Sequence, residues 1–262
     1  MPAVTLAAFL RHQRLRGLSP RTVERRAWSL GAWVAHVDPG GLDVPVEVLE
    51  DFLSRYRTPA TRHAVLSDVR ALYAWAGRRR MVSADPTVLM EAQRVPRRLP
   101  TPVRPEDVRA ALAASSGDVR TMILLAAHAG LRVSEVAAVC GRDVQPDRGL
   151  LVVRQGKGGK DREVPMSAEL ARALRGVPSG PLFPGVNGDG VRRRIKAVFA
   201  RCGIDARAHD LRASFATQLA RKSRGNVVAV AALMGHESVA TTERYMGWTP
   251  ELSSLVEGLY DG

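Results

Sequence analysis

Apolar residues recur at helical spacing along the amino-terminal part of the chain, which predicts amphipathic helices packed around a shared core. Ser19 and Pro20 indicate a helix start, because serine caps helices and proline suits their first turn. Two apolar stripes are Val23, Ala27, Leu30, Val34 and Val37 in one helix, and Val65, Val69, Leu72 and Ala76 in another. The predicted helices cover residues 5–16, 20–37 and 59–77, with one more inside 46–56.

The pattern changes between Gly149 and Met166, where the runs LLVVR and REVPM flank the segment QGKGGKD. Two short apolar runs around a glycine-rich segment predict two strands joined by a turn. Helical spacing returns on both sides, so we expect a mainly α protein with a small β hairpin or sheet. The helices expected here cover 105–114, 119–129, a short stretch from 132, 167–174, 209–222, 227–234, 239–245 and 251–259, and one more with the stripe Val191, Ile195, Val198 and Phe199.

A basic, proline-rich segment separates these two parts. At 262 residues the chain is longer than a usual single domain, so two domains are expected. Residues 94–104, RVPRRLPTPVR, hold four arginines, three prolines and no acidic residue, and prolines disfavour a regular helix or a central strand. We predict an extended basic linker at 94–104, a helical domain over 1–93 and a second domain over 105–262.

Charge points to the class of partner. The chain has 39 Arg and Lys residues against 26 Asp and Glu residues, a formal net charge of +13, and all but four of the basic residues are arginine. A guanidinium binds two phosphate oxygens at once, so a polyanion such as nucleic acid is the expected partner. An excess of arginine also follows from a GC-rich genome, and the composition therefore serves only as support.

Other functional classes are disfavoured. The sequence has no apolar run long enough to span a bilayer and no signal peptide at its start, so we expect a cytoplasmic location and no membrane partner. Cys140 and Cys202 have no ligand-like spacing to a histidine, which disfavours a zinc site and a disulfide. The segment GKGGKD lacks the spacing of a nucleotide-binding loop. We expect no metal and no other cofactor.

Polar residues suited to phosphate chemistry gather in one helical block near the carboxyl end. Each of them alone is more often a packed or buried residue, but two histidines, an arginine and a tyrosine together suggest a phosphate site. His128 illustrates the ordinary case, because it lies in the apolar run MILLAAHAG and is expected to be a core histidine. The four candidates are His209, Arg212, His236 and Tyr245.

Three residues earlier in the chain complete the candidate site. Arg132 follows a break at Gly130 and precedes Glu135 by three residues, so the two share a helix face and the carboxylate can hold the guanidinium. Lys157 lies between two glycines at the tip of the predicted hairpin, where backbone and ammonium can approach a ligand closely.

The ordered segments AGLRVSEV, QGKGGKDREVP, HDLRASFAT, LMGH and TTERYMG resemble the tyrosine recombinase family, also called the phage integrase family. The segment ATRHAVLSDVRALYAWAGRRRMVSADP is similar to the end of that family's core-binding domain, so the resemblance covers nearly the whole chain. The chain begins almost directly with the core-binding helices, which favours a simple integrase or Xer-like member. One departure is Ala213, since the family often has a histidine or another polar residue after HDLR.

The resemblance implies that Tyr245 attacks a DNA phosphate and forms a 3'-phosphotyrosyl bond. Arg132 and Arg212 would bind the phosphate oxygens, and Glu135 would support Arg132. Tyr260 is the next candidate nucleophile.

The resemblance also implies the proton carriers. Lys157 would protonate the departing 5' oxygen. His209 and His236 would hydrogen-bond the phosphate, and His209 would also assist deprotonation of Tyr245. Such a site needs neither a metal nor a nucleotide.

The family architecture implied is a two-domain DNA clamp, made of a helical core-binding (SAM-like) domain and the catalytic domain. The implied partners are duplex recombination sites and further copies of the chain, as a tetramer on DNA, and an accessory DNA-bending protein is left open. The tail after Tyr245 either packs on its own domain or docks on a neighbouring copy. The residues expected to contact DNA are Arg21, Arg25, Arg94, Arg97, Arg98, Lys160, Arg192, Arg193 and Lys196.

Three functions agree with these residues. A site-specific recombinase, with integration as the expected role, is the preferred hypothesis. A type IB topoisomerase uses a similar set of residues to nick and reseal one strand. A catalytically silent DNA-binding regulator is disfavoured, because all seven candidate site residues are present.

Overall fold

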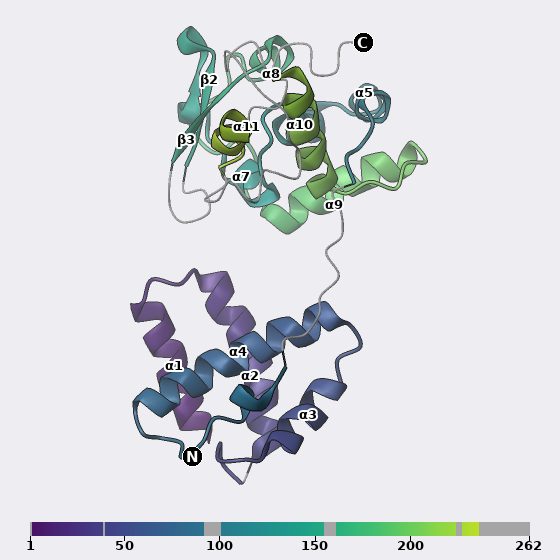
Figure 1. The fold of residues 1–262 in the computed structure, drawn as a ribbon. Coiled ribbons are helices and arrows are strands. Elements are labelled where there is room, and N and C mark those ends of the chain that lie inside the picture. Colours follow the sequence, from purple (N-terminus) through teal and green to yellow (C-terminus); the bar gives the residue numbers. More distant parts are fainter. Residues whose placement is uncertain (1, 39, 92–100, 155–160, 224–226, 236–262) are drawn as a thin grey trace. The chain divides into compact units, whose positions relative to one another are not determined.

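The computed structural model describes residues 2–38, 40–91, 101–154, 161–223 and 227–235 (Figure 1). The chain divides into two compact units, Met1–Arg98 and Leu99–Gly262, which are described separately. The division falls inside the segment predicted to be a linker. Within the described residues, no helix is both long and apolar enough to cross a membrane.

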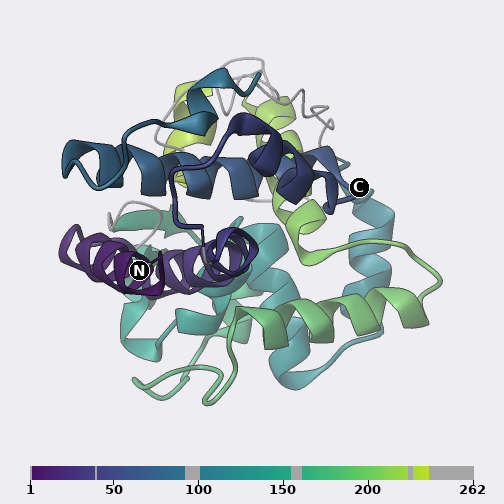
Figure 2. The same cartoon turned by 90° about the horizontal axis from the view of Figure 1, so that it is seen from below.

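Unit 1 is a bundle of helices. The helix α2 begins where Ser19 and Pro20 predict it, because the Ser19 hydroxyl accepts a hydrogen bond from the backbone N–H of Thr22 at 3.3 Å. The helix α1 packs along α2, and α4 contacts both (Figure 2). The elements are α1 (Pro2–Leu15), α2 (Pro20–Val37), α3 (Val46–Ser54), α4 (Pro59–Arg78) and the short 3-10 helix η1 (Pro86–Leu89).

The core of unit 1 is built around aromatic side chains. Trp33 and Phe52 pack edge to face with ring centroids 5.1 Å apart, and Tyr73 donates a hydrogen bond to the carbonyl of Leu42 at 2.6 Å. The predicted stripe of α4 is confirmed, since Val65, Val69, Leu72 and Ala76 are all buried. On α2, Val23, Leu30, Val34 and Val37 are buried as predicted, Ala27 is half-buried, and Trp33 joins them.

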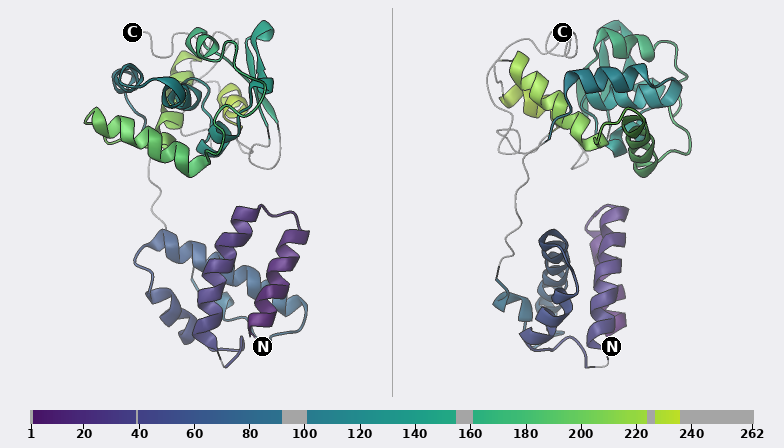
Figure 3. Two further views of the ribbon diagram at one scale, coloured as in Figure 1. Left: turned by 180° about the vertical axis from the view of Figure 1, so that it is seen from behind. Right: turned by 90° about the vertical axis from the view of Figure 1, so that its right-hand side faces the viewer.

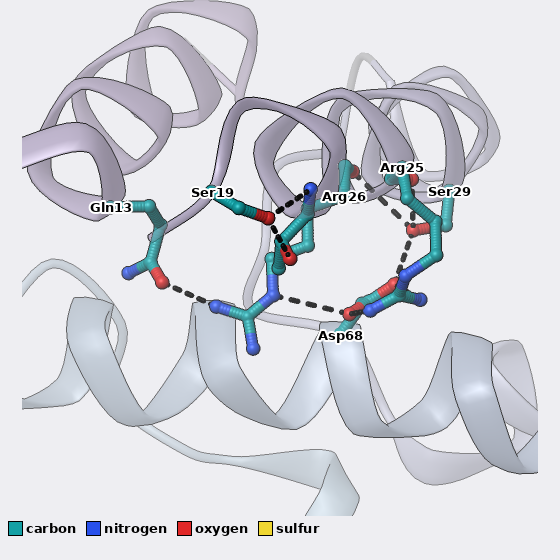
Figure 4. A network of polar contacts seen from close by, with 7 residues as sticks. Gln13, Ser19, Arg25, Arg26, Ser29 and Asp68 are labelled. Carbon is teal, nitrogen blue, oxygen red and sulfur yellow. Dashed lines mark hydrogen bonds and ion pairs between the residues drawn. The ribbon is translucent and has the colours of Figure 1, made fainter. Parts of the chain in front are cut away.

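A buried carboxylate braces three helices of unit 1 (Figure 4). Asp68 on α4 is fully buried and receives both terminal nitrogens of Arg25 on α2, at 2.5 and 2.8 Å. Arg26 reaches the same carboxylate at 3.3 Å and also donates to Gln13 on α1. Ser29 adds a hydroxyl donor to Asp68 at 2.8 Å. The contact joins α1, α2 and α4.

Unit 2 combines helices with a small sheet. Its helices are α5 (Pro105–Ala113), α6 (Gly117–His128), α7 (Val133–Ala138), α8 (Ala168–Ala173), α9 (Gly188–Arg201), α10 (Ala208–Lys222) and α11 (Val227–Met234), with 3-10 helices η2 (Gly141–Asp143) and η3 (Pro146–Arg148). The strands are β1 (Val144–Gln145), β2 (Leu150–Val153) and β3 (Arg162–Pro165).

The sheet is antiparallel, in the order β1-β2-β3. Strands β2 and β3 form the predicted hairpin, with Val153 opposite Arg162, and lie along one edge of the unit (Figure 3, left). Strand β1 was not predicted, because two residues are too few to show an alternating pattern. The mainly helical fold with a small sheet is as expected.

The core of unit 2 gathers around α6 and α10, which pack against each other. The predicted stripe of α9 is confirmed, since Val191, Ile195, Val198 and Phe199 are buried. Helix α11 lies between α10 and β3 (Figure 1). His128 is buried in the core, as expected, and its Nδ1 hydrogen-bonds the Ser167 hydroxyl at 3.0 Å.

Several predicted features lie outside the described residues. They are the first seven residues of the predicted linker, the tip of the hairpin at 155–160, and the helices expected at 239–245 and 251–259.

Candidate active site

Arg132 and Glu135 form the ion pair that their spacing predicts. Gly130 ends the preceding segment with φ 63°, and any side chain there would collide with the ring of Phe215. The chain then turns into α7, with Arg132 at its amino-terminal cap. The guanidinium Nη1 of Arg132 lies 2.6 Å from Glu135 Oε1, and its backbone N–H donates to Oε2 at 2.8 Å. The Glu135 carboxylate therefore caps α7 and holds Arg132 at once.

Arg162, at the start of β3, also binds Glu135 and was not predicted as a site residue. Its Nη1 donates to Oε1 at 3.0 Å and its Nη2 to Oε2 at 2.8 Å. The strand pattern indicates that Arg162 is on the buried face, because it is two residues before the buried Val164 and thus faces the same side of β3. An arginine on a buried face needs a carboxylate partner.

Arg212 reaches the same carboxylate from α10. Its side chain is only 3% exposed, and its Nη1 lies 3.8 Å from Glu135 Oε2. It also donates hydrogen bonds to the carbonyls of Gly130 and Met234. The structure therefore brings together Arg132 and Arg212, which are 80 positions apart in the sequence, as the proposed chemistry requires.

The carboxyl end of α11 completes this arrangement. Arg162 Nε donates to the carbonyl of Leu233 at 3.1 Å, and Arg132 Nη2 donates to that of Gly235 at 3.2 Å. With the Arg212 contact to Met234, three successive carbonyls each receive one arginine. Carbonyls at a helix carboxyl end lack partners within the helix and carry partial negative charge, so they suit cations. We call Glu135, its three arginines and these three carbonyls the arginine cluster.

The arginine cluster keeps a surplus of positive charge. Three guanidiniums face one carboxylate, which leaves two positive charges among side chains that are 26%, 10% and 3% exposed for Arg132, Arg162 and Arg212. Burial by itself would raise the pKa of Glu135, but the hydrogen bonds and charge of Arg162 and the hydrogen bonds of Arg132 lower it to about 2. The carboxylate is therefore ionised at neutral pH.

His209 lies beside these arginines on α10. It is three residues before Arg212 and belongs to the exposed surface of the unit. Partial removal of its ring from water, and then the positive charge of Arg212, lower the pKa of His209, with Arg132 contributing in the same direction. The lowered pKa favours the neutral imidazole, which is the form that can accept a proton.

The other predicted catalytic residues, Lys157, His236 and Tyr245, lie outside the described residues. For two of the three, the described residues that border their segments in sequence include members of the arginine cluster. Gly235 belongs to it and directly precedes His236, and Arg162 in β3 follows the hairpin segment that contains Lys157.

The predicted DNA-contacting residues have different surroundings. Arg21 is exposed on α2, whereas Arg25 uses both terminal nitrogens on Asp68 and is half-exposed. Arg192, Arg193 and Lys196 are exposed on α9, where Arg192 pairs with Asp189 at 3.0 Å. Arg94, Arg97, Arg98 and Lys160 lie outside the described residues.

A cavity of about 330 Å³ adjoins the arginine cluster. Its lining includes Glu135 and Ser134 on α7, together with Arg142, Asp143 and Arg154. Arg154 Nε lies 2.5 Å from the buried Asp143 carboxylate. In the described part of the chain, no three His, Cys, Asp or Glu side chains gather as metal ligands would.

The family assignment follows from comparison with known sequences. A model of the phage integrase family matches residues 103–251, which is more than half of the chain. The chain belongs to the phage integrase family. The resemblance carried by the five motifs is confirmed, and the arginine cluster lies wholly within the matched region of this integrase-family protein.

Named relatives of this integrase-family protein are Xer recombinases. Tyrosine recombinase XerD of Ralstonia nicotianae is 36% identical over 201 residues, which are 67% of this chain and 65% of that protein, a little under two thirds of its length. Tyrosine recombinase XerA of Thermococcus kodakarensis is 29% identical over 271 residues, covering 95% of this chain and 93% of that protein.

A solved structure shares the fold of this integrase-family protein. A lambda integrase dimer bound to a COC' core site aligns with 93% of this chain and 76% of that chain, with a TM-score of 0.75. The two sequences are 17% identical, so the likeness is one of fold.

Proposed function

We propose that this protein is a site-specific recombinase that cuts and rejoins duplex DNA through a 3'-phosphotyrosyl intermediate. One observation carries the proposal: Arg132 and Arg212 meet at Glu135, close to His209, in a chain of the phage integrase family. Such a fixed group of positive charges stabilises the negative charge that develops when phosphorus becomes five-coordinate.

The three arginines differ in access. Arg132 is the most exposed of them and is the one that contacts the non-bridging phosphate oxygens first. Arg212 is held almost completely inside the protein by two carbonyls, so it acts on the phosphate mainly through its charge at short range.

Cleavage requires one nucleophile and two proton transfers. The phenolic oxygen of Tyr245 attacks phosphorus and forms the new O–P bond, while the bond from phosphorus to the 5' oxygen breaks. His209 accepts the phenolic proton, and Lys157 donates a proton to the departing 5' oxygen. His236 hydrogen-bonds a phosphate oxygen.

Rejoining runs in reverse. A 5'-hydroxyl from the same or a second duplex attacks the phosphotyrosine, Lys157 takes its proton, and the phenol of Tyr245 is restored. The link to Tyr245 conserves the energy of the broken bond, so no nucleotide is consumed. Exchange between two duplexes needs four cleavages, which four copies on DNA supply.

The two units have separate tasks in this proposal. Unit 2 carries the chemistry, and unit 1 with the basic segment 94–104 binds the flanking duplex, mainly through phosphate contacts. The reaction takes place in the cytoplasm, where chromosomal and phage DNA are accessible.

The test uses supercoiled plasmids that carry fragments of the source genome, incubated with wild-type protein and with Tyr245→Phe. Wild type is expected to form a covalent protein–DNA adduct and to exchange strands between two copies of one site, and Tyr245→Phe is expected to bind without either. Binding by wild type with no adduct would identify a silent DNA-binding regulator. Relaxation without strand exchange would identify a topoisomerase.

A further inference from the structure

Arg162 uses every nitrogen of its guanidinium on two structural partners. Two nitrogens bind the two oxygens of Glu135 at 3.0 and 2.8 Å, and the third binds the carbonyl of Leu233 at 3.1 Å. Its side chain is 10% exposed. The residue therefore has little capacity left to bind DNA directly, and its effect is on the groups that it holds.

The partners of Arg162 lie on different elements. Glu135 is on α7 and also holds Arg132, whereas Leu233 is at the end of α11, whose next two carbonyls hold Arg212 and Arg132. Arg162 itself begins β3 of the hairpin. One side chain thus connects the hairpin to both structures that fix the arginine pair.

We propose that Arg162 is a positioning residue, which aligns Arg132 and Arg212 for the cleavage step by holding Glu135 and the end of α11. The inference rests on the proposed function and extends it to a residue that contacts no substrate. Without Arg162, Glu135 loses its bidentate partner and Leu233 loses its donor. The Glu135 carboxylate and the end of α11, which both hold Arg132, then remain joined only through Arg132 itself and the longer Arg212 contact, so their relative position is less firmly fixed.

The surroundings of Gly235 show how closely Arg162 packs against the end of α11. A Cβ atom at Gly235 would lie 3.0 Å from both Cδ and Nη1 of Arg162. The backbone at the end of α11 and the guanidinium of Arg162 are therefore packed against each other, and a shift of either one reaches Arg132 through the Gly235 carbonyl.

The test compares Arg162→Ala, Arg162→Lys and wild type on a nicked suicide duplex, measuring DNA affinity and single-turnover cleavage separately. Misplacing a phosphate-binding group by about 1 Å costs on the order of a hundredfold in rate. We expect Arg162→Ala to cleave about a hundredfold more slowly with affinity within about threefold of wild type. Arg162→Lys has one nitrogen in place of three, so its cleavage rate should lie between those of Arg162→Ala and wild type.

Arg120 provides a matched control. Its guanidinium also binds a carboxylate and a carbonyl, Glu169 at 2.5 Å and Leu112 at 2.6 Å, but on α6 and away from the arginine cluster. Arg120→Ala should cleave at the wild-type rate per folded molecule. Added guanidinium ion at non-denaturing concentration should restore part of the cleavage rate of Arg162→Ala and leave Arg120→Ala unchanged.

The cleavage rates and DNA affinities of these variants either support or overturn the positioning role of Arg162. The inference is overturned if Arg162→Ala, or Arg162→Lys where the alanine variant does not fold, cleaves at the wild-type rate per folded molecule. It is also overturned if the loss is in DNA affinity alone, or if Arg120→Ala loses the same rate. If the wild-type protein itself forms no adduct, the proposed function fails together with this inference. If wild type forms the adduct and only the expected effect of Arg162 is absent, the inference alone fails.

Discussion

Glu135 is the residue on which the arginine cluster depends most. One carboxylate binds three guanidiniums and caps the first turn of α7, so its negative charge offsets the repulsion among the three arginines. Its pKa is held at about 2. Because this pKa is below that of an unfolded glutamate, the ionised carboxylate stabilises the folded protein above about pH 4.5.

We predict that this stability is lost as pH falls from about 4.5 through about 2. Glu135→Gln should lower the free energy of unfolding at pH 7 by about 3 kcal/mol, since one pKa unit corresponds to about 1.4 kcal/mol. At pH 3 wild type has lost most of this advantage, so the difference between the two proteins should narrow. Urea unfolding followed by circular dichroism at pH 7 and pH 3 measures the free energy of unfolding of both proteins. A difference between wild type and Glu135→Gln that is equal at the two pH values would contradict the prediction.

Asp68 has a comparable position in unit 1, where it is fully buried among Arg25, Arg26 and Ser29 (Figure 4). Asp68→Asn should destabilise unit 1 by about 2 kcal/mol or more, because it removes charge-assisted hydrogen bonds. Three of the four tryptophans are in unit 1, so intrinsic fluorescence during urea unfolding reports on it.

Asp51→Asn is the control for that measurement. Asp51 is 66% exposed and pairs with Arg55 at 3.3 Å, so its loss should cost less than about 1 kcal/mol. Equal effects of the two substitutions would show that the Asp68 network does not brace the bundle.

Helix α11 is the element whose carboxyl end holds the arginines. It ends at Gly235 with φ 60°, a left-handed conformation that lets the chain leave the helix while the last carbonyls face the arginines. The residue that follows is His236. The geometry of this helix end therefore sets the positions of the carbonyls that hold the three arginines.

We predict that Gly235→Ala lowers the cleavage rate at least tenfold, because the new methyl group presses on Arg162 as well as straining the backbone. Gly203→Ala is the matched control, since Gly203 has φ 71° and open space around its Cβ position. Both should lose about 1 kcal/mol of stability. Single-turnover cleavage should separate them, and equal rates would contradict the prediction.

The helices were predictable from the sequence because each buries one face. The stripes of α4 and α9 follow from spacing alone, and Ser19 with Pro20 locates the start of α2. The strand β1 was not predictable, since two residues carry no period. For Arg162, the strand pattern indicates a side chain on the buried face of β3, but its partners on α7 and at the end of α11 are distant in sequence and could not be predicted.

For the whole molecule, the sequence predicted the family and the ion pair between Arg132 and Glu135. It did not predict that the successive carbonyls of Leu233, Met234 and Gly235, at and just after the end of α11, receive three arginines, because that arrangement exists only after distant segments pack. The arginine cluster is thus a product of the tertiary fold, whereas the identity of the candidate catalytic residues came from motifs.

In the proposed reaction, Tyr245 becomes covalently joined to DNA. A nicked suicide duplex, from which the released 5' fragment diffuses away, traps the adduct, and mass spectrometry of the DNA-linked peptide locates the modified residue. We expect the DNA 3' phosphate on Tyr245 in wild type and no adduct in Tyr245→Phe. The proposal that Tyr245 is the nucleophile would be contradicted by an adduct on another residue, with Tyr260 the next candidate. It would also be contradicted by an adduct that persists in Tyr245→Phe.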